Sequence, residues 1–163
     1  MNNKKKEIFI IVDGSSYLYR AYYALPHLKN KDGKHTGAIF GVTNMINKLI
    51  NDYTPEYLSI VFDARGKNFR HKLYSEYKAN RKSMPVELSE QVEPILEFIK
   101  HMGINLIMYP DVEADDVIAS LVNTHSKNSK ILISSGDKDL AQLVNKNVTL
   151  INSLDGKELD EDG

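Results

Sequence analysis

Four carboxylates crowd into six residues at 111–116, where the sequence reads Asp-Val-Glu-Ala-Asp-Asp. The stretch lies between two apolar runs, at 104–109 and 117–122. Carboxylates also follow three other strand-like apolar runs along the chain. The acids placed in this way are Asp13, Asp63, Glu113, Asp115, Asp116, Asp137 and Asp139. The carboxyl ends of parallel strands share one edge of a sheet, so we expect these acids to gather there.

Helix capping is the ordinary explanation for a single acid at such a position, and Asp13 or Asp111 taken alone fits it well. Capping does not explain a cluster of acids, because two unit charges about 4 Å apart repel by about 4 kcal/mol at an effective dielectric of 20. Such a cluster needs positive charge close to it. All-oxygen ligands suit Mg²⁺ or Mn²⁺, whereas the absent cysteines and scattered histidines argue against zinc. Two such ions about 3.5–4 Å apart are typical of phosphodiester hydrolysis. The sequence therefore predicts a divalent-metal site that acts on phosphodiesters.

The segment 64–84 carries the opposite charge. Its net charge is +6, and the rest of the chain is −7. Aromatic residues Phe69, Tyr74 and Tyr77 are interleaved with the cations, and Lys78 and Arg81 are three positions apart. Cations combined with stacking rings are typical of single-stranded nucleic-acid binding. A solvated charged surface is the alternative interpretation of the same segment.

The elements that must position these groups alternate along the chain. Buried strands are predicted at 8–12, 57–62, 104–109, 131–135 and 148–151, and helices at 17–24, 38–51, 85–102 and 111–125, with a short helix through 144. Ser15 or Ser16 is expected to cap the first helix and Thr36 the second, and 155–156 resembles a hairpin turn. This order predicts one α/β domain, with a mainly parallel central sheet flanked by helices.

Five motifs closely resemble one family. They are Ile-Val-Asp-Gly-Ser-Ser-Tyr-Leu-Tyr-Arg-Ala-Tyr at 11–22, Val-Phe-Asp-Ala-Arg-Gly-Lys-Asn-Phe-Arg at 61–70, Tyr-Lys-Ala-Asn-Arg at 77–81, Val-Glu-Ala-Asp-Asp-Val-Ile at 112–118 and Ser-Ser-Gly-Asp-Lys-Asp-Leu-Ala-Gln-Leu-Val at 134–144. They resemble, in order and over nearly the whole chain, the N-terminal 5′→3′ exonuclease domains of bacterial DNA polymerase I, which belong to the flap endonuclease family.

The resemblance implies a PIN-like nuclease fold with a basic helical arch at 64–84. It implies an enzyme that uses Mg²⁺ or Mn²⁺, two ions in the complete domain, and takes part in DNA replication and repair; we expect a monomer. The absence of cysteines and of a long apolar run indicates a cytoplasmic protein. The implied substrates are DNA with 5′ flaps or nicks and RNA–DNA primer junctions. The seven acids named above match the family's metal ligands. Lys78 and Arg81 match arch residues at the scissile phosphate, and with Asp115 and Asp116 they are the candidate catalytic residues. Candidate DNA-binding residues are Arg20, Arg70, Tyr77, Lys78 and Arg81.

The family's domain continues beyond 163 residues, so we expect 1–163 to be its N-terminal part. Two further aspartates and a helix–hairpin–helix element have no match in this chain. An alternative to an active nuclease is therefore a catalytically incomplete nucleic-acid-binding fragment. A small-molecule phosphotransfer enzyme fits poorly, since Asp13 lacks a second acid two residues on, and no P-loop motif occurs.

Overall fold

A six-stranded sheet forms the centre of the protein, with the strand order β3-β2-β1-β4-β5-β6. The computed structural model describes residues 6–64, 66, 69–74, 76–79 and 82–163, so the candidate residue Arg81 lies outside them. The strands are β1 (Ile8–Asp13), β2 (Tyr57–Val61), β3 (Asn105–Ile107), β4 (Lys130–Ser135), β5 (Val148–Asn152) and β6 (Glu158–Leu159). All neighbouring pairs are parallel except β5 and β6, which are antiparallel.

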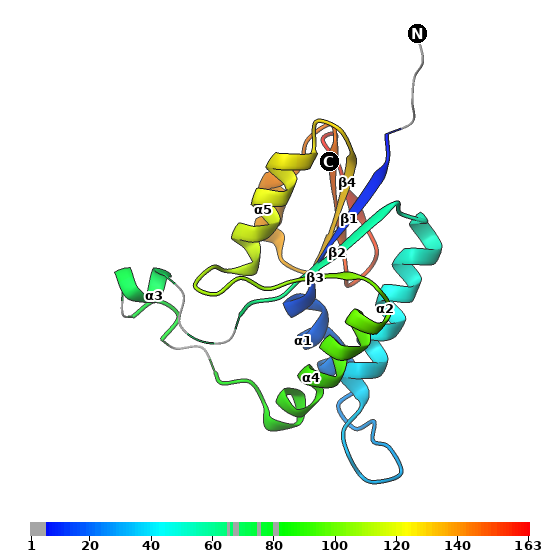
Figure 1. Ribbon diagram of the computed structural model, residues 1–163, viewed down its shortest axis with the longest axis vertical. Coiled ribbons are helices and arrows are strands. Elements are labelled where there is room, and N and C mark those ends of the chain that lie inside the picture. The colour runs from blue at the N-terminus through cyan, green and yellow to red at the C-terminus, as the bar shows by residue number, and fades with distance from the viewer. Residues whose placement is uncertain (1–5, 65, 67–68, 75, 80–81) are drawn as a thin grey trace.

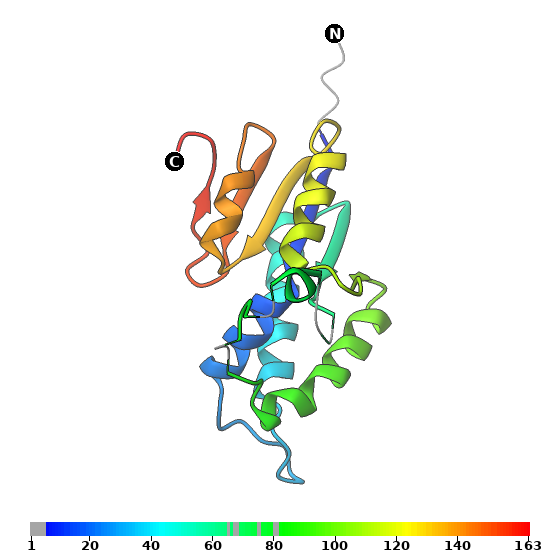
Figure 2. The ribbon, with the colours of Figure 1, turned by 90° about the vertical axis from the view of Figure 1, so that its left-hand side faces the viewer.

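The helices cover both faces of this sheet (Figures 1 and 2). They are α1 (Gly14–Ala24), α2 (Gly37–Tyr53), α4 (Val86–His101), α5 (Ala114–His125) and the 3₁₀ helix η1 (Lys138–Leu143), whereas the short helix α3 (Phe69–Leu73) lies away from the sheet. The predicted α/β fold with a mainly parallel sheet is thus confirmed. None of the helices in the described part of the chain has both the length and the apolar composition that a membrane crossing requires.

The side chains of β1 point alternately to the two faces of the sheet, and each face has its own hydrophobic core. Ile10 and Val12 belong to a core cluster with α1, α2 and α4, whereas Phe9 and Ile11 belong to a second cluster with α5 and η1. Successive strand residues point to opposite faces, so a continuous β-branched run can serve two cores at once. Because β1 lies between β2 and β4, its last residue, Asp13, lies at the centre of the carboxyl edge.

Several predicted boundaries differ in detail. Helix α1 begins at Gly14 rather than at 17, because Asp13 is its N-cap and accepts a hydrogen bond from the backbone N–H of Ser16 (3.0 Å). The expected Ser15 or Ser16 cap is therefore wrong. Thr36 stands at the start of α2 without a side-chain cap bond. That role falls to buried Gln91 of α4, whose side-chain oxygen accepts from two N–H groups at the start of α2.

Candidate metal centre and basic segment

Asp13 is the most deeply buried acid of the carboxyl edge, with 5% of its surface exposed. Its two carboxylate oxygens accept hydrogen bonds from the Ser16 backbone N–H (3.0 Å) and the Ser135 hydroxyl (2.6 Å). Burial raises the pKa of Asp13, and the two hydrogen bonds oppose that increase. Ser135 ends β4, so neighbouring strands hold this carboxylate in one orientation.

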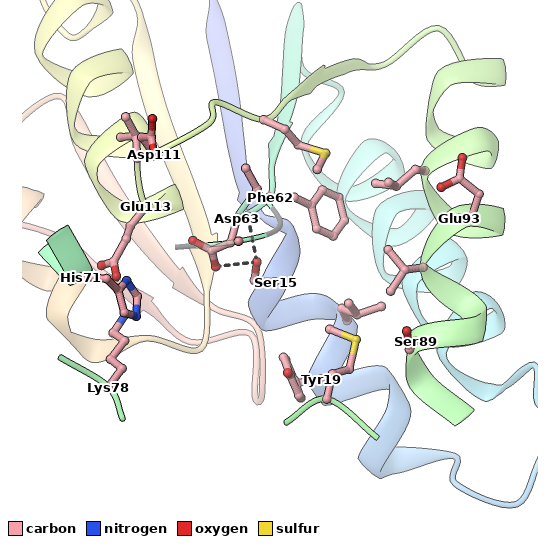
Figure 3. Close-up of a pocket in the computed structure, with 18 residues that line it drawn as sticks. Ser15, Tyr19, Phe62, Asp63, His71, Lys78, Ser89, Glu93, Asp111 and Glu113 are labelled. Carbon is pink, nitrogen blue, oxygen red and sulfur yellow. Dashed lines mark hydrogen bonds and ion pairs between the residues drawn. The ribbon is translucent and has the colours of Figure 1, made fainter. Parts of the chain in front are cut away.

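Asp63, just beyond β2, joins the starts of two helices. One oxygen accepts from the Ala114 backbone N–H of α5 (2.8 Å), and the other accepts from the Ser15 hydroxyl of α1 (2.9 Å; Figure 3). An acid at a helix N-terminus satisfies an otherwise unpaired N–H group and benefits from the helix dipole. Asp63 thereby fixes the spacing between α1 and α5 across the site.

Asp115, in the first turn of α5, faces the greatest concentration of negative charge. Burial, together with repulsion from Asp13, Asp137, Asp63 and Glu113, raises its pKa to about 6. The predicted gathering of acids from separate strand ends is therefore present for these five groups. A carboxylate whose ionised form is disfavoured by neighbouring carboxylates is where a cation gives the most relief.

Asp137 and Asp139 occupy the loop and first turn after β4. Asp137 caps η1 by accepting from the Asp139 backbone N–H (2.9 Å), and its own N–H donates to the Ser135 hydroxyl (2.9 Å). Ser135 therefore links Asp137 to Asp13. Asp139 is exposed and does not appear among the charges that act on Asp115.

Glu113 and Asp116 turn toward cations of the basic segment. Lys78 lies 2.8 Å from Glu113, and the Tyr77 hydroxyl donates to the same carboxylate (3.2 Å). Arg70 binds Asp116 through both of its terminal nitrogens (2.6 and 2.8 Å) and lies 3.3 Å from Glu113. These contacts lower the pKa of Asp116. Three predicted DNA-contacting residues thus lie directly against predicted metal ligands.

Arg20 occupies a different environment. Its guanidinium donates to the Leu154 carbonyl (2.8 Å), and its other terminal nitrogen is buried with no hydrogen-bond partner among the described groups. The Ser153 hydroxyl is also buried, and none of the residues that the structure describes forms a hydrogen bond with it. Arg20 therefore ties α1 to the loop after β5. The role in phosphate binding predicted for Arg20 stays a prediction.

A cleft of about 750 Å³ opens beside the acids, between the basic segment and α4. Asp63, Lys78 and Glu113 line its polar side, and Phe62 and Leu96 are among its apolar lining (Figure 3). Glu113 and Lys78 point toward each other on one side of the cleft, and α4 lies on the other side (Figure 3). The cleft is open to solvent next to the carboxyl edge, so an extended ligand can reach the acids.

The donor set fits a hard divalent cation, because carboxylate and hydroxyl oxygens are the ligands that Mg²⁺ and Mn²⁺ prefer. Their mutual repulsion at Asp115 supports the same fit. Within the described residues, however, no three acidic or histidine side chains converge closely enough to hold one ion. Asp13, Asp63 and Asp115 would hold an ion once they move closer together, whereas Glu113 and Asp116 must also give up their cationic partners.

Sequence reasoning missed Ser15 and Ser135, which orient Asp63 and Asp13. The signal was present, since each serine lies within two positions of an acid that we had selected. Hydroxyl groups that fix the second oxygen of a ligating carboxylate are a common feature of metal sites.

Comparison with known proteins gives a consistent result. The family model described as "5'-3' exonuclease, N-terminal resolvase-like domain" matches residues 8–163. DNA polymerase I of Pseudomonas aeruginosa is 48% identical over 155 residues, which cover 94% of this chain and 17% of that protein. The 5'-3' exonuclease of Buchnera aphidicola subsp. Baizongia pistaciae is 45% identical over 159 residues, which cover 97% of this chain and 53% of the relative. The chain thus spans about half of the exonuclease relative.

Solved structures agree on the fold. Phage T5 5'-exonuclease with bound zinc ions matches with a TM-score of 0.70 at 20% identity, over 94% of this chain and 58% of that one. The T5 flap endonuclease in a complex with DNA and metal ions matches with a TM-score of 0.68 at 20% identity, over 94% of this chain and 57% of that one. At this identity the likeness supports the PIN-like arrangement of sheet and helices.

Proposed function

Because this chain belongs to the family of 5′-3′ exonuclease N-terminal resolvase-like domains, we propose that it forms the metal-binding half of a nuclease that hydrolyses DNA phosphodiesters. The observation that carries the proposal is the arrangement at the carboxyl edge, where hydrogen bonds hold Asp13 and Asp63 near the start of α5. Burial, with repulsion from these and two other acids, raises the pKa of Asp115 there to about 6. Such a cluster beneath a basic segment fits a phosphate backbone held over divalent cations.

Mg²⁺ or Mn²⁺, two ions in the complete domain, would be held by Asp13, Asp63, Glu113, Asp115, Asp116, Asp137 and Asp139, and would activate water and stabilise the leaving oxygen. Asp13 and Asp63 supply fixed carboxylates, since Ser135, Ser15 and helix N–H groups hold their orientation. The proposed cofactor is supported by the metal ions that are named with the related T5 nucleases.

The proposed contacts to the scissile phosphate are Lys78 and Arg81. The proposed contacts to the rest of the DNA strand are Tyr77, Arg70 and Arg20. Support comes from Lys78, which lies within ion-pairing distance of Glu113 and is therefore close enough to share a phosphate with the metal site. A cation at this place stabilises the negative charge that develops on the phosphate oxygens. Arg81 lies outside the described residues, so its role follows from the motif alone.

The proposed substrates are DNA with 5′ flaps or nicks and RNA–DNA primer junctions, in primer removal and DNA repair by a cytoplasmic monomer. We further propose that the native domain completes its second metal site with two aspartates and grips duplex DNA with a helix–hairpin–helix element. Support is the share of the Buchnera exonuclease that this chain covers, which is 53%.

One observation favours a binding fragment as the second candidate. Within the described residues no three acids converge on one ion, and Arg70 and Lys78 already neutralise part of the cluster. Such a chain would hold nucleic acid through its basic segment without turning it over.

Cleavage of a labelled 5′-flap DNA separates the two candidates. We expect cutting in Mg²⁺ or Mn²⁺, none in EDTA, and none by the double variant Asp115→Asn/Asp116→Asn. Binding of the same DNA is followed in parallel by fluorescence anisotropy. Retained binding with no cutting by the unmodified chain would contradict the nuclease proposal for residues 1–163 and support the binding fragment.

A further inference from the structure

One arginine bridges two of the acids that the proposed metal site requires. The Arg70 guanidinium lies 2.6 Å from one oxygen of Asp116 and 2.8 Å from the other, and 3.3 Å from Glu113. Paired N–H groups match a carboxylate in both distance and plane, which makes this the strongest common form of ion pair. Both oxygens of Asp116 are therefore engaged.

The Arg70 side chain is held in this place by its own helix. Its guanidinium lies over the Phe69 ring at 4.7 Å, and the Phe69 backbone N–H donates to the Asp111 carbonyl (2.9 Å). Lys72 adds an exposed ion pair to the Asp111 carboxylate (3.0 Å). Helix α3 is thus docked on the loop that leads into α5, and the Arg70 bridge also attaches it to α5 itself.

A divalent cation and Arg70 compete for the same oxygen atoms. Glu113 is the N-cap of α5, and Asp116 lies in its first turn, so neither can move far from the cluster. Asp115, between them in sequence, faces the other acids instead. A cation bound by Asp115 can therefore also bind Glu113 and Asp116 only if the carboxylate oxygens of these two residues lose their contacts with Arg70.

We propose that Arg70 is a positioning residue that serves as the internal counter-ion of Glu113 and Asp116, and that a divalent cation displaces it and thereby undocks α3. The inference rests on the proposed metal site. Two ligands that exclude each other lower each other's affinity by the same factor. Arg70 therefore weakens metal binding, and bound metal loosens α3 and frees the Arg70 guanidinium from the acids.

Calorimetric titration with Mn²⁺ tests the competition. Three proteins are compared: the unmodified chain, Arg70→Gln, and the matched control Lys72→Gln, which removes the same charge from the same helix but leaves Asp116 and Glu113 untouched. A hydrogen-bonded ion pair of this kind, partly exposed, corresponds to an affinity change of about tenfold. We expect Arg70→Gln to bind Mn²⁺ about tenfold more tightly, and Lys72→Gln to stay within about twofold of the unmodified chain.

Hydrogen exchange at the amides of Phe69 and Tyr74 measures how firmly α3 is held. If Arg70 had only a structural role, Mn²⁺ would not change these exchange rates. Both amides are hydrogen-bonded, to Asp111 and to Arg70 respectively. We expect Mn²⁺ to speed their exchange in the unmodified chain, whereas in Arg70→Gln exchange is already fast and Mn²⁺ adds little. Arg70→Lys, which keeps the charge but not the paired geometry, should fall between the two.

Weaker or unchanged Mn²⁺ binding by Arg70→Gln would overturn the inference, because Arg70 would then hold the acids ready for the metal. Slower exchange at Phe69 on adding Mn²⁺ would overturn it as well. If the unmodified chain binds no Mn²⁺ while circular dichroism shows it folded, both this inference and the proposed metal site fail. Tight binding with no dependence on Arg70 removes the inference alone.

Discussion

Asp115 should destabilise the metal-free protein at neutral pH, so replacing this proposed ligand should stabilise it. The folded state raises the pKa of Asp115 from its ordinary value of 3.8 to about 6, chiefly through burial and then through repulsion by four acids. A group with a raised pKa contributes stability that is fully present below its unfolded pKa and lost as pH rises through its folded pKa. The loss therefore occurs between about pH 4 and pH 6.

The magnitude follows from the same values. Each pKa unit corresponds to about 1.36 kcal/mol, so an increase from 3.8 to about 6 costs at most about 3 kcal/mol. Asp115 is only partly buried, and solvent screening reduces this to about 1.5 kcal/mol. Asp115→Asn removes the charge and keeps the shape. The variant should therefore gain about 1.5 kcal/mol at pH 8 and nothing at pH 4.

Urea denaturation in EDTA at pH 8 and pH 4 measures this difference. Asp116→Asn is the matched control, since it makes the same chemical change at the next residue. The Arg70 ion pair lowers the pKa of Asp116, so its contribution is present at pH 8 and lost as pH falls. Asp116→Asn should therefore lose stability at pH 8, and the loss should shrink toward acid.

Excess Mg²⁺ should then reverse the order at pH 8. A ligand at 100 times its Kd stabilises the folded state by about 2.7 kcal/mol. The unmodified chain should gain most of this amount, and Asp115→Asn should gain little. If Asp115→Asn loses stability at pH 8 in EDTA, or gains the same amount at both pH values, the assignment of Asp115 to a repulsive cluster is refuted.

Three further predictions follow from other contacts. Lys78→Met should lower the rate of flap cleavage by about 100-fold in single-turnover assays with little change in DNA affinity; an unchanged rate would place Lys78 outside the phosphate site. Gly41→Ala should lower the free energy of unfolding by about 1–3 kcal/mol in urea, since the added carbon would lie 2.6 Å from the Ala21 side chain. Gln91→Met should cost about 2–3 kcal/mol, because one buried and one part-buried N–H group at the start of α2 lose their acceptor; an unchanged urea midpoint would contradict this.

Local sequence was sufficient for the architecture. The β-branched runs at 8–12 and 131–135 lie in strands, and the turn at 155–156 joins two antiparallel strands as predicted. The run at 104–109 yields only the short strand β3, because it pairs on one side alone at the edge of the sheet. An apolar run in the sequence therefore predicts well which residues are buried, but it predicts poorly how many of them pair with a neighbouring strand.

The sequence could predict that the acids which repel Asp115 lie near one another, but not the contacts that the acids make. Strand ends identify the acids, but nothing local in sequence says that Asp116 pairs with Arg70, which is 46 positions away. The same holds for Gln91, which caps a helix 53 positions earlier. Such contacts depend on how the helices pack against the sheet and against each other. Secondary-structure propensities and the spacing of residues in the sequence do not determine that packing. The hydrogen bond from the Arg20 guanidinium to the Leu154 carbonyl, 134 positions away, is a further example.

The central position of β1 also governs when the protein can fold during its synthesis. Asp13 is made early, yet the hydroxyl that orients it belongs to Ser135, which follows 122 positions later. On the ribosome, β1 and β2 can pair soon after residue 61 emerges, but the face next to β4 stays open until 135 is free. Contacts so distant in sequence slow folding, because the loop between them must close first. The nascent chain therefore carries one unpaired edge of β1 while residues 62–135 are made, and an unpaired strand edge is a place where another chain can pair with it.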